Sequence, residues 1–262
     1  MCLILLAWRA HPDYPLILAA NRDEFFSRPT QIAGPWPEAP GTIAGRDLEK
    51  GGTWLAVSAR GRLAAVTNYR DGTEPRSGTR SRGLLVSEFV VSDLGPAPFL
   101  SRVREEDESY QGFNLLVAAD GVLLHYAKPG HCLTRVAPGI HGLSNHLLDT
   151  PWPKVERGKA ALHLLLGTSG EPLIDGLFHA LGDTYLPPDD ALPRTGVGVE
   201  RERLLSTAFI AAPDYGTRAS TVVLVESSGA ITFVERNFGP ESRPLEMRRL
   251  RITPQVSALP RA

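Results

Sequence analysis

Apolar runs in this chain come in pairs joined by short polar turns, a pattern that predicts antiparallel hairpins. The pairs predict about eight strands: Cys2–Trp8 with Tyr14–Ala20, Trp54–Ser58 with Leu63–Thr67, Phe113–Ala118 with Val122–Tyr126, and Thr221–Glu226 with Ala230–Glu235. Several runs, such as Leu3–Ala7, are apolar at every position. Both faces of those strands therefore need to be covered.

Segments with helical periodicity lie between the hairpins and can supply that cover. They are Arg82–Ser92, Pro96–Arg104, Pro153–Leu166 and Leu173–Leu181. An α+β sandwich of four layers, αββα, with two mainly antiparallel sheets satisfies both patterns, and a single sheet with helices on each face is the alternative. Asp149 or Thr150 is expected to cap the helix that begins near Pro153.

Two stretches rich in proline and glycine, Gly34–Gly41 and Leu186–Gly198, are interpreted as surface loops or lids. Neither of them separates two complete sets of strands and helices. We therefore expect residues 1–253 to form one domain and residues 254–262 to form a flexible tail.

The charge balance gives no support to nucleic-acid or membrane-surface binding, because 262 residues carry a net charge of only −1. The first apolar run follows no basic segment and meets Arg9 far short of a membrane span, so we expect neither a secretory signal nor a spanning helix. Cys2 and Cys132 are the only cysteines and do not form a disulfide framework. These features predict a cytoplasmic protein in a reducing compartment.

Cys2 is the residue whose position suggests the most specific chemical reactivity. Removal of Met1 would leave a thiol and an α-amine on one residue, a nucleophile and a base together. Their reference pKa values are about 8.5 and about 7.7–8.0, so both groups change protonation near neutral pH. The alternative is that Cys2 is a small apolar residue that starts a buried strand.

Hairpin pairing predicts the neighbours of Cys2. A turn centred near His11 and Pro12 pairs Cys2 with Asn21, give or take about two residues. The polar run Asn21-Arg22-Asp23-Glu24 therefore lies beside the thiol. Alternatively, these four polar residues are simply the solvent-exposed end of the strand.

Three further residues are candidates for acyl chemistry. Asn68, at the end of an apolar strand, and Asn145 could donate hydrogen bonds to an oxyanion, although asparagine at turns often serves the backbone. Arg218 precedes an apolar strand and could favour the thiolate, or form an ion pair at the strand entrance.

Together these segments resemble the NRDE family, the family of the transport and Golgi organisation protein 2. The blocks that carry the resemblance, in order from Cys2 to about Phe238, are Asn21–Glu24, Gly51–Val57, Thr67–Arg70, Ser81–Gly83, Gly112–Leu115, Gly142–Asn145, Leu148–Lys154 and Tyr215–Arg218. The family is similar to N-terminal-nucleophile hydrolases of the cysteine branch, which include penicillin V acylases and bile-salt hydrolases. The resemblance implies an αββα sandwich with Cys2 as nucleophile.

The same resemblance implies roles for the other residues. Asn21 and Asp23 would orient the amine of Cys2, Asn68 would stabilise the oxyanion, and Asn145 would be a second functional asparagine. Arg218 would match a late arginine of the branch.

One position departs from the branch pattern. Ala20 stands where the branch has an arginine just before the asparagine. Arg22 is the nearest arginine, and strand alternation is expected to turn its side chain to the other face.

Two main functions follow. The first is hydrolysis of an amide or thioester of a small or lipidic acyl compound, which needs no cofactor. The alternative is a non-catalytic protein that binds and carries haem, acyl-coenzyme A or another amphipathic ligand, as the resemblance implies, and a scaffold without chemistry is a third possibility.

Two groups of residues bear on the binding alternative. The histidines near apolar or turn segments, His125, His131, His141 and His146, show no metal-ligand spacing and fit structural roles better. The basic cluster Arg70, Arg76, Arg80 and Arg82 fits either the phosphates of a coenzyme A-like group or a solvated loop.

Overall fold

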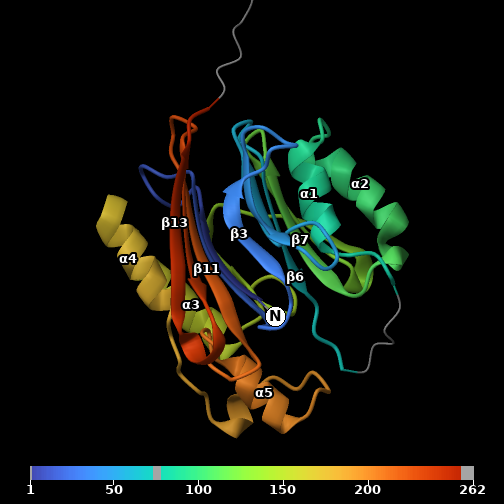
Figure 1. The fold of residues 1–262 in the computed structure, drawn as a ribbon, viewed down its shortest axis with the longest axis vertical. Coiled ribbons are helices and arrows are strands. Elements are labelled where there is room, and N and C mark those ends of the chain that lie inside the picture. The colour runs from blue at the N-terminus through green and yellow to red at the C-terminus, as the bar shows by residue number, and fades with distance from the viewer. Residues whose placement is uncertain (1, 73–77, 255–262) are drawn as a thin grey trace, which may run out of the picture.

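The computed structural model describes residues 2–72 and 78–254. Two antiparallel sheets pack face to face, and helices cover the outer face of each, so the predicted αββα sandwich is confirmed (Figure 1). The first sheet has the spatial order β10 (Gly139–Leu143), β1 (Cys2–Trp8), β2 (Leu16–Phe25), β11 (Tyr215–Val225), β12 (Ile231–Phe238) and β13 (Pro244–Ile252). The second has the order β3 (Thr30–Pro35), β4 (Thr42–Asp47), β5 (Leu55–Ser58), β6 (Leu63–Asn68), β7 (Phe113–Ala119), β8 (Val122–Ala127) and β9 (Cys132–Arg135).

The helices have the bounds α1 (Gly83–Val91), α2 (Pro96–Glu106), α3 (Pro153–Leu165), α4 (Gly170–Leu181) and α5 (Val199–Ser206). The helices α1 to α4 divide between the two outer faces, and α5 lies at one end of the sandwich (Figure 1). α1 and α2 pack on the second sheet, whereas α3 and α4 pack on the first. Short 3₁₀ turns lie at Asp107–Ser109, Pro129–His131, Asp189–Ala191 and Pro240–Ser242. Across residues 2–72 and 78–254, no helix is long and apolar enough to cross a membrane.

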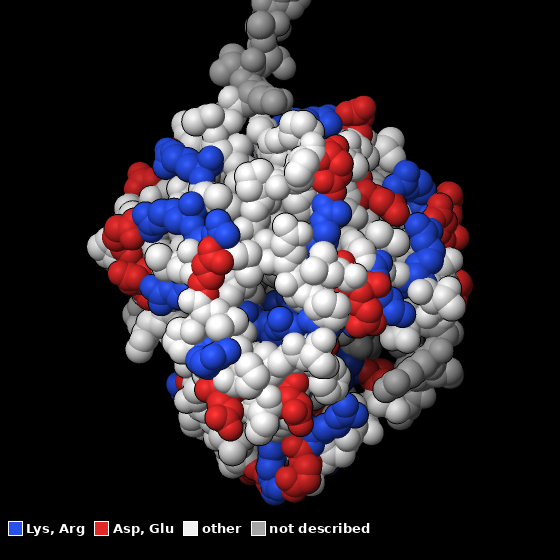
Figure 2. Space-filling view, viewed as in Figure 1, with Lys and Arg blue, Asp and Glu red and all other residues white. Residues whose placement is uncertain are grey.

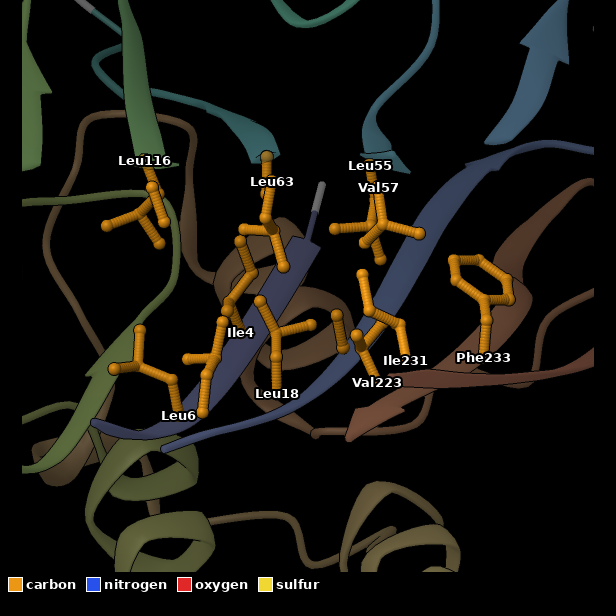
Figure 3. Close-up of a cluster of buried hydrophobic side chains, with 14 of the residues drawn as sticks. Ile4, Leu6, Leu18, Leu55, Val57, Leu63, Leu116, Val223, Ile231 and Phe233 are labelled. Carbon is orange, nitrogen blue, oxygen red and sulfur yellow. The ribbon is translucent and has the colours of Figure 1, made fainter. Parts of the chain in front are cut away.

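Three layers of buried apolar side chains explain the runs that are apolar at every position. Between the sheets, Ile4, Leu6 and Leu18 meet Leu55 and Leu63 (Figure 3). The alternate positions of the same strands face the helices, where they form a second and a third cluster. Each inner strand is therefore covered on both faces.

The predicted hairpins are all present, with ends that differ by a few residues. β2 is the important difference, because it continues through Asn21–Phe25 and carries the polar run inside the sheet. The prediction missed β3, β4, β9, β10, β13 and α5. β13 is a mostly exposed edge strand without clean alternation, and the loop predicted from Gly34 begins only after β3 ends at Pro35.

Two expectations concern the ends of elements. The cap predicted at Asp149 or Thr150 is wrong, because the residue before α3 is Trp152 and no side chain caps the helix. Asp149 instead has a positive φ of 59°, and its carboxylate accepts hydrogen bonds from the backbone N–H of Gly142 and from His141. The tail predicted at 254–262 lies outside the described residues beyond Pro254.

Candidate active site

Cys2 lies where the apolar core between the sheets gives way to polar residues. It shares its face of β1 with Ile4 and Leu6, and it lines a cavity of about 290 Å³. Trp54, Asn68 and Arg82 from the second sheet and its helix layer also line this cavity. Figure 2 shows Lys and Arg side chains gathered at a hollow between the two sheets.

A close approach of two glycines brings the second half of the cavity together. Gly52 has a φ of 76°, and a Cβ there would lie 2.3 Å from the carbonyl carbon of Gly83. The backbone N–H of Thr53 donates to the Gly83 carbonyl over 3.1 Å. Glycine at position 52 therefore lets the segment before β5 pack against the start of α1.

Arg22 is the direct cross-strand partner of Cys2 in the β1–β2 ladder. This pairing lies within the predicted register. The expected orientation of Arg22 was wrong, because residues 20 and 22 share one face of a strand, and cross-strand partners face the same side. Arg22 therefore lines the cavity beside Cys2, and its guanidinium lies 4.9 Å from the centre of the Trp54 ring.

Asn21 points to the opposite face, towards the helix layer, and its side chain is fully engaged there. Its Nδ2 donates to the carbonyls of Leu181 and Ala208, each at 2.8 Å. Its Oδ1 accepts from the Ser220 hydroxyl at 2.6 Å. The structure does not bring the Asn21 amide to the cavity.

Asp23 is buried next to Cys2 and contacts it through the backbone. Its N–H donates a hydrogen bond to the Cys2 sulfur. Its Oδ1 accepts from the Thr217 hydroxyl at 2.7 Å. Burial raises the pKa of the Asp23 carboxyl, although the positive charge of Lys154 opposes the shift.

The two candidate asparagines have different positions. Asn68 lines the cavity, and its side chain makes no hydrogen bond within the described part of the chain. Asn145 is fully buried, and its Nδ2 donates to the Asn68 carbonyl at 2.9 Å. Its neighbour Ser144 donates to the Cys2 carbonyl at 2.9 Å. Asn145 and Ser144 thus connect the end of β6 to the start of β1 rather than facing the cavity.

Arg218 lies at a bulge of β11 and does not line the cavity. Its Nη1 donates to three backbone carbonyls, those of Phe25, Phe26 and Arg28. It fixes the chain just after β2. The arginine next to the thiol is therefore Arg22.

Buried charges surround Asp23 on the helix side. Lys154 of α3 is buried, its Nζ donates to the Leu205 carbonyl at 2.9 Å, and burial lowers its pKa to about 8. Nearby, Arg70 and Glu202 form a buried ion pair, with 3.1 Å between Nη2 and Oε2. Burial also raises the pKa of the Cys2 thiol.

The profile of the Transport and Golgi organisation 2 family matches residues 1–240. The chain belongs to that family. A Transport and Golgi organization protein 2 homolog from Bos taurus is 40% identical over 258 residues, covering 90% of this chain and 93% of the relative. The Homo sapiens homolog is 38% identical with the same coverage, and Transport and Golgi organization protein 2 of Drosophila melanogaster is 29% identical over 90% of this chain and 91% of its own.

Two solved structures resemble this member of the family at low sequence identity. A mutant conjugated bile acid hydrolase from Clostridium perfringens gives a TM-score of 0.45 at 9% identity, covering 95% of this chain and 92% of its own. A Caenorhabditis elegans ortholog of the N-acylethanolamine-hydrolyzing acid amidase gives 0.42 at 12% identity, covering 85% and 92%.

Sequence reasoning did not assign Trp54, Arg82 or Lys154 to the site. Trp54 and Lys154 belonged to motif blocks but were given no role, and Arg82 belonged to the basic cluster.

The residues of the basic cluster have different environments in the structure: Arg70 is buried, Arg80 forms ion pairs with Glu88 and Glu106, and Arg82 lines the cavity. Arg76 lies outside the described residues. The one signal that could have indicated a buried role was Lys154, a lysine within an apolar, proline-rich block at the start of α3.

Proposed function

We propose that this protein is a hydrolase that uses Cys2 to cleave an amide or thioester bond of a small acyl compound. The observation that carries the proposal is the position of the thiol. It lines a cavity, accepts a hydrogen bond from the backbone N–H of Asp23, and shares the cavity with the side chain of Asn68. Acyl transfer needs a positioned nucleophile and a donor for the oxyanion; the Asp23 N–H holds the sulfur, and the Asn68 amide is the candidate donor.

The proposed mechanism begins from the neutral thiol, because burial raises its pKa. The α-amine that Cys2 gains when Met1 is removed takes the thiol proton as the sulfur attacks the acyl carbon. Asn68 stabilises the oxyanion, and the ammonium then protonates the departing amine or thiol. Water releases the acyl group from sulfur and restores the thiol.

The buried groups behind Cys2 support this role for the amine. Asp23 is held by Thr217 and lies near the positive charge of Lys154. A carboxylate at this position favours the protonated form of a neighbouring amine. Both cysteines are free thiols, which accords with a reducing compartment such as the cytoplasm.

Mass spectrometry and labelling test the proposal together. We expect the protein isolated from cells to lack Met1, and a neutral acyl electrophile to acylate Cys2 much faster than Cys132, which is exposed. Cys132→Ala is the matched control and should label normally at Cys2. Retention of Met1 on every molecule, or equal labelling of the two cysteines, would contradict the mechanism.

One observation favours the alternative, a protein that binds an acyl-coenzyme A, lipid or haem without chemistry. A thiol with a raised pKa is less nucleophilic at rest. No histidine of the described residues lines the cavity, so haem bound there would use Cys2 as its ligand. The candidate histidines have partners elsewhere: His125 with Asn114, His131 with Asp107, His141 with Asp149, and His146 with Thr150.

Haem titration separates the two functions. Specific ligation by Cys2 predicts a Soret band that shifts in Cys2→Ala and stays unchanged in Cys132→Ala. The same spectrum in both variants would leave only non-specific adsorption and remove this alternative for haem.

A further inference from the structure

Two arginines that line the Cys2 cavity have no carboxylate partner among residues 2–72 and 78–254. Arg22 is 6% exposed, and its Nη1 is buried without a hydrogen-bond partner. Arg82 donates from Nη1 to the Gly112 carbonyl at 3.1 Å and forms no ion pair within these residues. A buried guanidinium without a paired carboxylate is costly to maintain, so Arg22 is a candidate to receive an anion. Arg82 is half-buried at the same cavity and can act as a second donor.

The other cations that line the cavity are either paired or exposed. Arg28 contacts Asp47 at 2.7 Å, and Arg80 contacts Glu106 at 2.7 Å. Lys50 is exposed. Among the arginines that line the cavity, only Arg22 and Arg82 form no ion pair within the described residues, and the charges of both interact with Cys2. The carboxylates of Glu235 and Glu24 act on Arg22 and Arg82 respectively without forming an ion pair with them.

The start of α1 adds a third source of positive potential. Ser81, Arg82 and Gly83 line the cavity at the N-terminal end of this nine-residue helix. The first turn of α1 carries no acidic residue and no side-chain cap. The N-terminal end of a helix attracts negative charge, and here nothing in the helix neutralises it.

We propose that Arg22 and Arg82 form a subsite for a carboxylate that the substrate carries within a few bonds of the reacting carbonyl. This inference rests on the proposed function and names its substrate class, of which N-acyl α-amino acids are the simplest members. Hydrolysis would transfer the acyl group to the Cys2 sulfur, release the amino acid with the proton from the ammonium, and use water to release the acid.

Three features of the cavity support a nearby carboxylate. Arg22 is the in-register neighbour of Cys2, so the anion lies close to the attacked carbon. The planar fork of a guanidinium matches a carboxylate. The volume of about 290 Å³ is at the small end of ligand sites, which suits a compact substrate or the reacting end of a longer one.

Alkylation with two reagents of nearly equal size tests the subsite. Iodoacetate and iodoacetamide differ by one negative charge, and Cys132 provides the internal reference. We expect the iodoacetate-to-iodoacetamide rate ratio at Cys2 to exceed that at Cys132 by about tenfold or more, since a hydrogen bond to a charged group contributes about 1.5–3 kcal/mol. Arg82→Gln should lower the ratio several-fold. Arg80→Gln, which removes an equal charge from an arginine that is already paired, should preserve it.

A binding measurement decides the case without relying on thiol reactivity. Calorimetric titration of Cys2→Ala should show N-butyrylglycine binding about tenfold or more tightly than the neutral N-butyrylglycinamide. Inorganic phosphate is the competing anion, and a carboxylate subsite predicts that acetate displaces N-butyrylglycine at least as well.

The outcomes separate the two proposals. If Cys2 is inert to both reagents but N-butyrylglycine binds selectively, the hydrolase proposal fails and the subsite stands. If Cys2 reacts quickly without charge preference and both ligands bind equally, the subsite is wrong and the hydrolase proposal stands. Stronger competition by phosphate than by acetate would overturn the assignment to a carboxylate.

Discussion

Arg70 and Arg22 lie in two neighbourhoods near Cys2 and share several features. Both are buried, with exposed fractions of 5% and 6%, and both guanidinium groups lie over a tryptophan ring, at 4.5 Å from Trp152 and 4.9 Å from Trp54. Arg70 forms an ion pair with buried Glu202, although its guanidinium nitrogens, like Nη1 of Arg22, are buried without a hydrogen bond. Arg22 forms no ion pair within residues 2–72 and 78–254, so the two arginines differ in charge compensation and not in hydrogen bonding.

The difference separates a structural arginine from a candidate ligand-binding one. Arg70 lies on the helix side, and its backbone N–H also donates to the Asn145 carbonyl at 2.7 Å. Its charge is compensated inside the protein. Arg22 lies on the cavity side, where a ligand can supply the compensating charge.

The largest expected effect is on stability at the paired arginine. Glu202→Gln leaves the Arg70 charge buried without its partner, so we expect the free energy of unfolding to fall by about 3–5 kcal/mol. Arg22→Gln should cost about 1 kcal/mol or less, the scale of its contact with Trp54. Urea denaturation of both variants measures the contrast, and equal losses would show that Arg22 has a compensating partner after all.

A second contrast is between Asn68, which should affect the catalytic rate, and Asn145, which should affect stability. Asn68→Ala should leave stability nearly unchanged but lower kcat by about 10²–10³-fold, since removal of an oxyanion donor costs about 2.7–4 kcal/mol in barrier. Asn145→Ala should lower the free energy of unfolding by about 1–3 kcal/mol because it removes the Nδ2 donor to the Asn68 carbonyl and one of the two contacts of the Ser144 hydroxyl. Turnover of N-butyrylglycine and urea denaturation measure the two effects. The contrast is contradicted if Asn68→Ala lowers the free energy of unfolding but leaves kcat unchanged.

Two lysines of α3 should respond to pH with opposite signs. Burial lowers the pKa of Lys154 from 10.5 to about 8. The folded state therefore binds the proton less well than the unfolded state, and wild type should gain stability over Lys154→Met as pH rises from 8 to 10.5.

Lys159 is the matched control on the same helix. Burial opposes its charge, but ion pairs with Glu156 and Asp149 raise its pKa overall. Wild type should therefore lose stability over Lys159→Met at alkaline pH. Urea midpoints from pH 8 to 10.5 test the gain at Lys154, and midpoints above pH 10.5 test the loss at Lys159. Parallel pH profiles for the two variants would contradict the assignment.

A final contrast concerns Glu235, a buried carboxyl that forms no ion pair among the described residues. Its oxygens accept from the backbone N–H of Ala33 at 2.9 Å and from the Thr221 hydroxyl at 3.1 Å. Burial raises its pKa, so protonation stabilises the fold, and wild type should lose stability relative to Glu235→Gln as pH rises above 4.5. Thermal unfolding from pH 4.5 to 8 measures this, and a flat difference would contradict it.

Prediction from the sequence succeeded where the information was local. Alternation and turn residues located the hairpins, and the β1–β2 turn placed Arg22 opposite Cys2 within the stated register. It failed for β13, whose exposed edge position leaves no hydrophobic pattern. It also failed for α5, a short and mostly polar helix.

The candidate site was predicted only in part, because distance along the chain hides which groups meet. Sequence reasoning placed Asn21, Asn145 and Arg218 in contact with the chemistry, but none of the three lines the cavity, and each donates to backbone carbonyls instead. Their side chains are amides and guanidinium groups, which bond to carbonyls as readily as to a substrate. Only the surroundings of each side chain distinguish these roles.

The sequence by itself determined the strand pairs, the double-faced apolar runs and the place of Cys2 beside the polar end of β2, because each depends on neighbours along one hairpin. Tertiary structure alone decided that Trp54, Asn68 and Arg82 face Cys2 across the sandwich. It also decided that Arg70 forms an ion pair with Glu202, whereas Arg22 forms none with any of the described residues. These outcomes depend on how two sheets and their helices pack, and the free energy of a buried charge is set by the groups that this packing brings within reach.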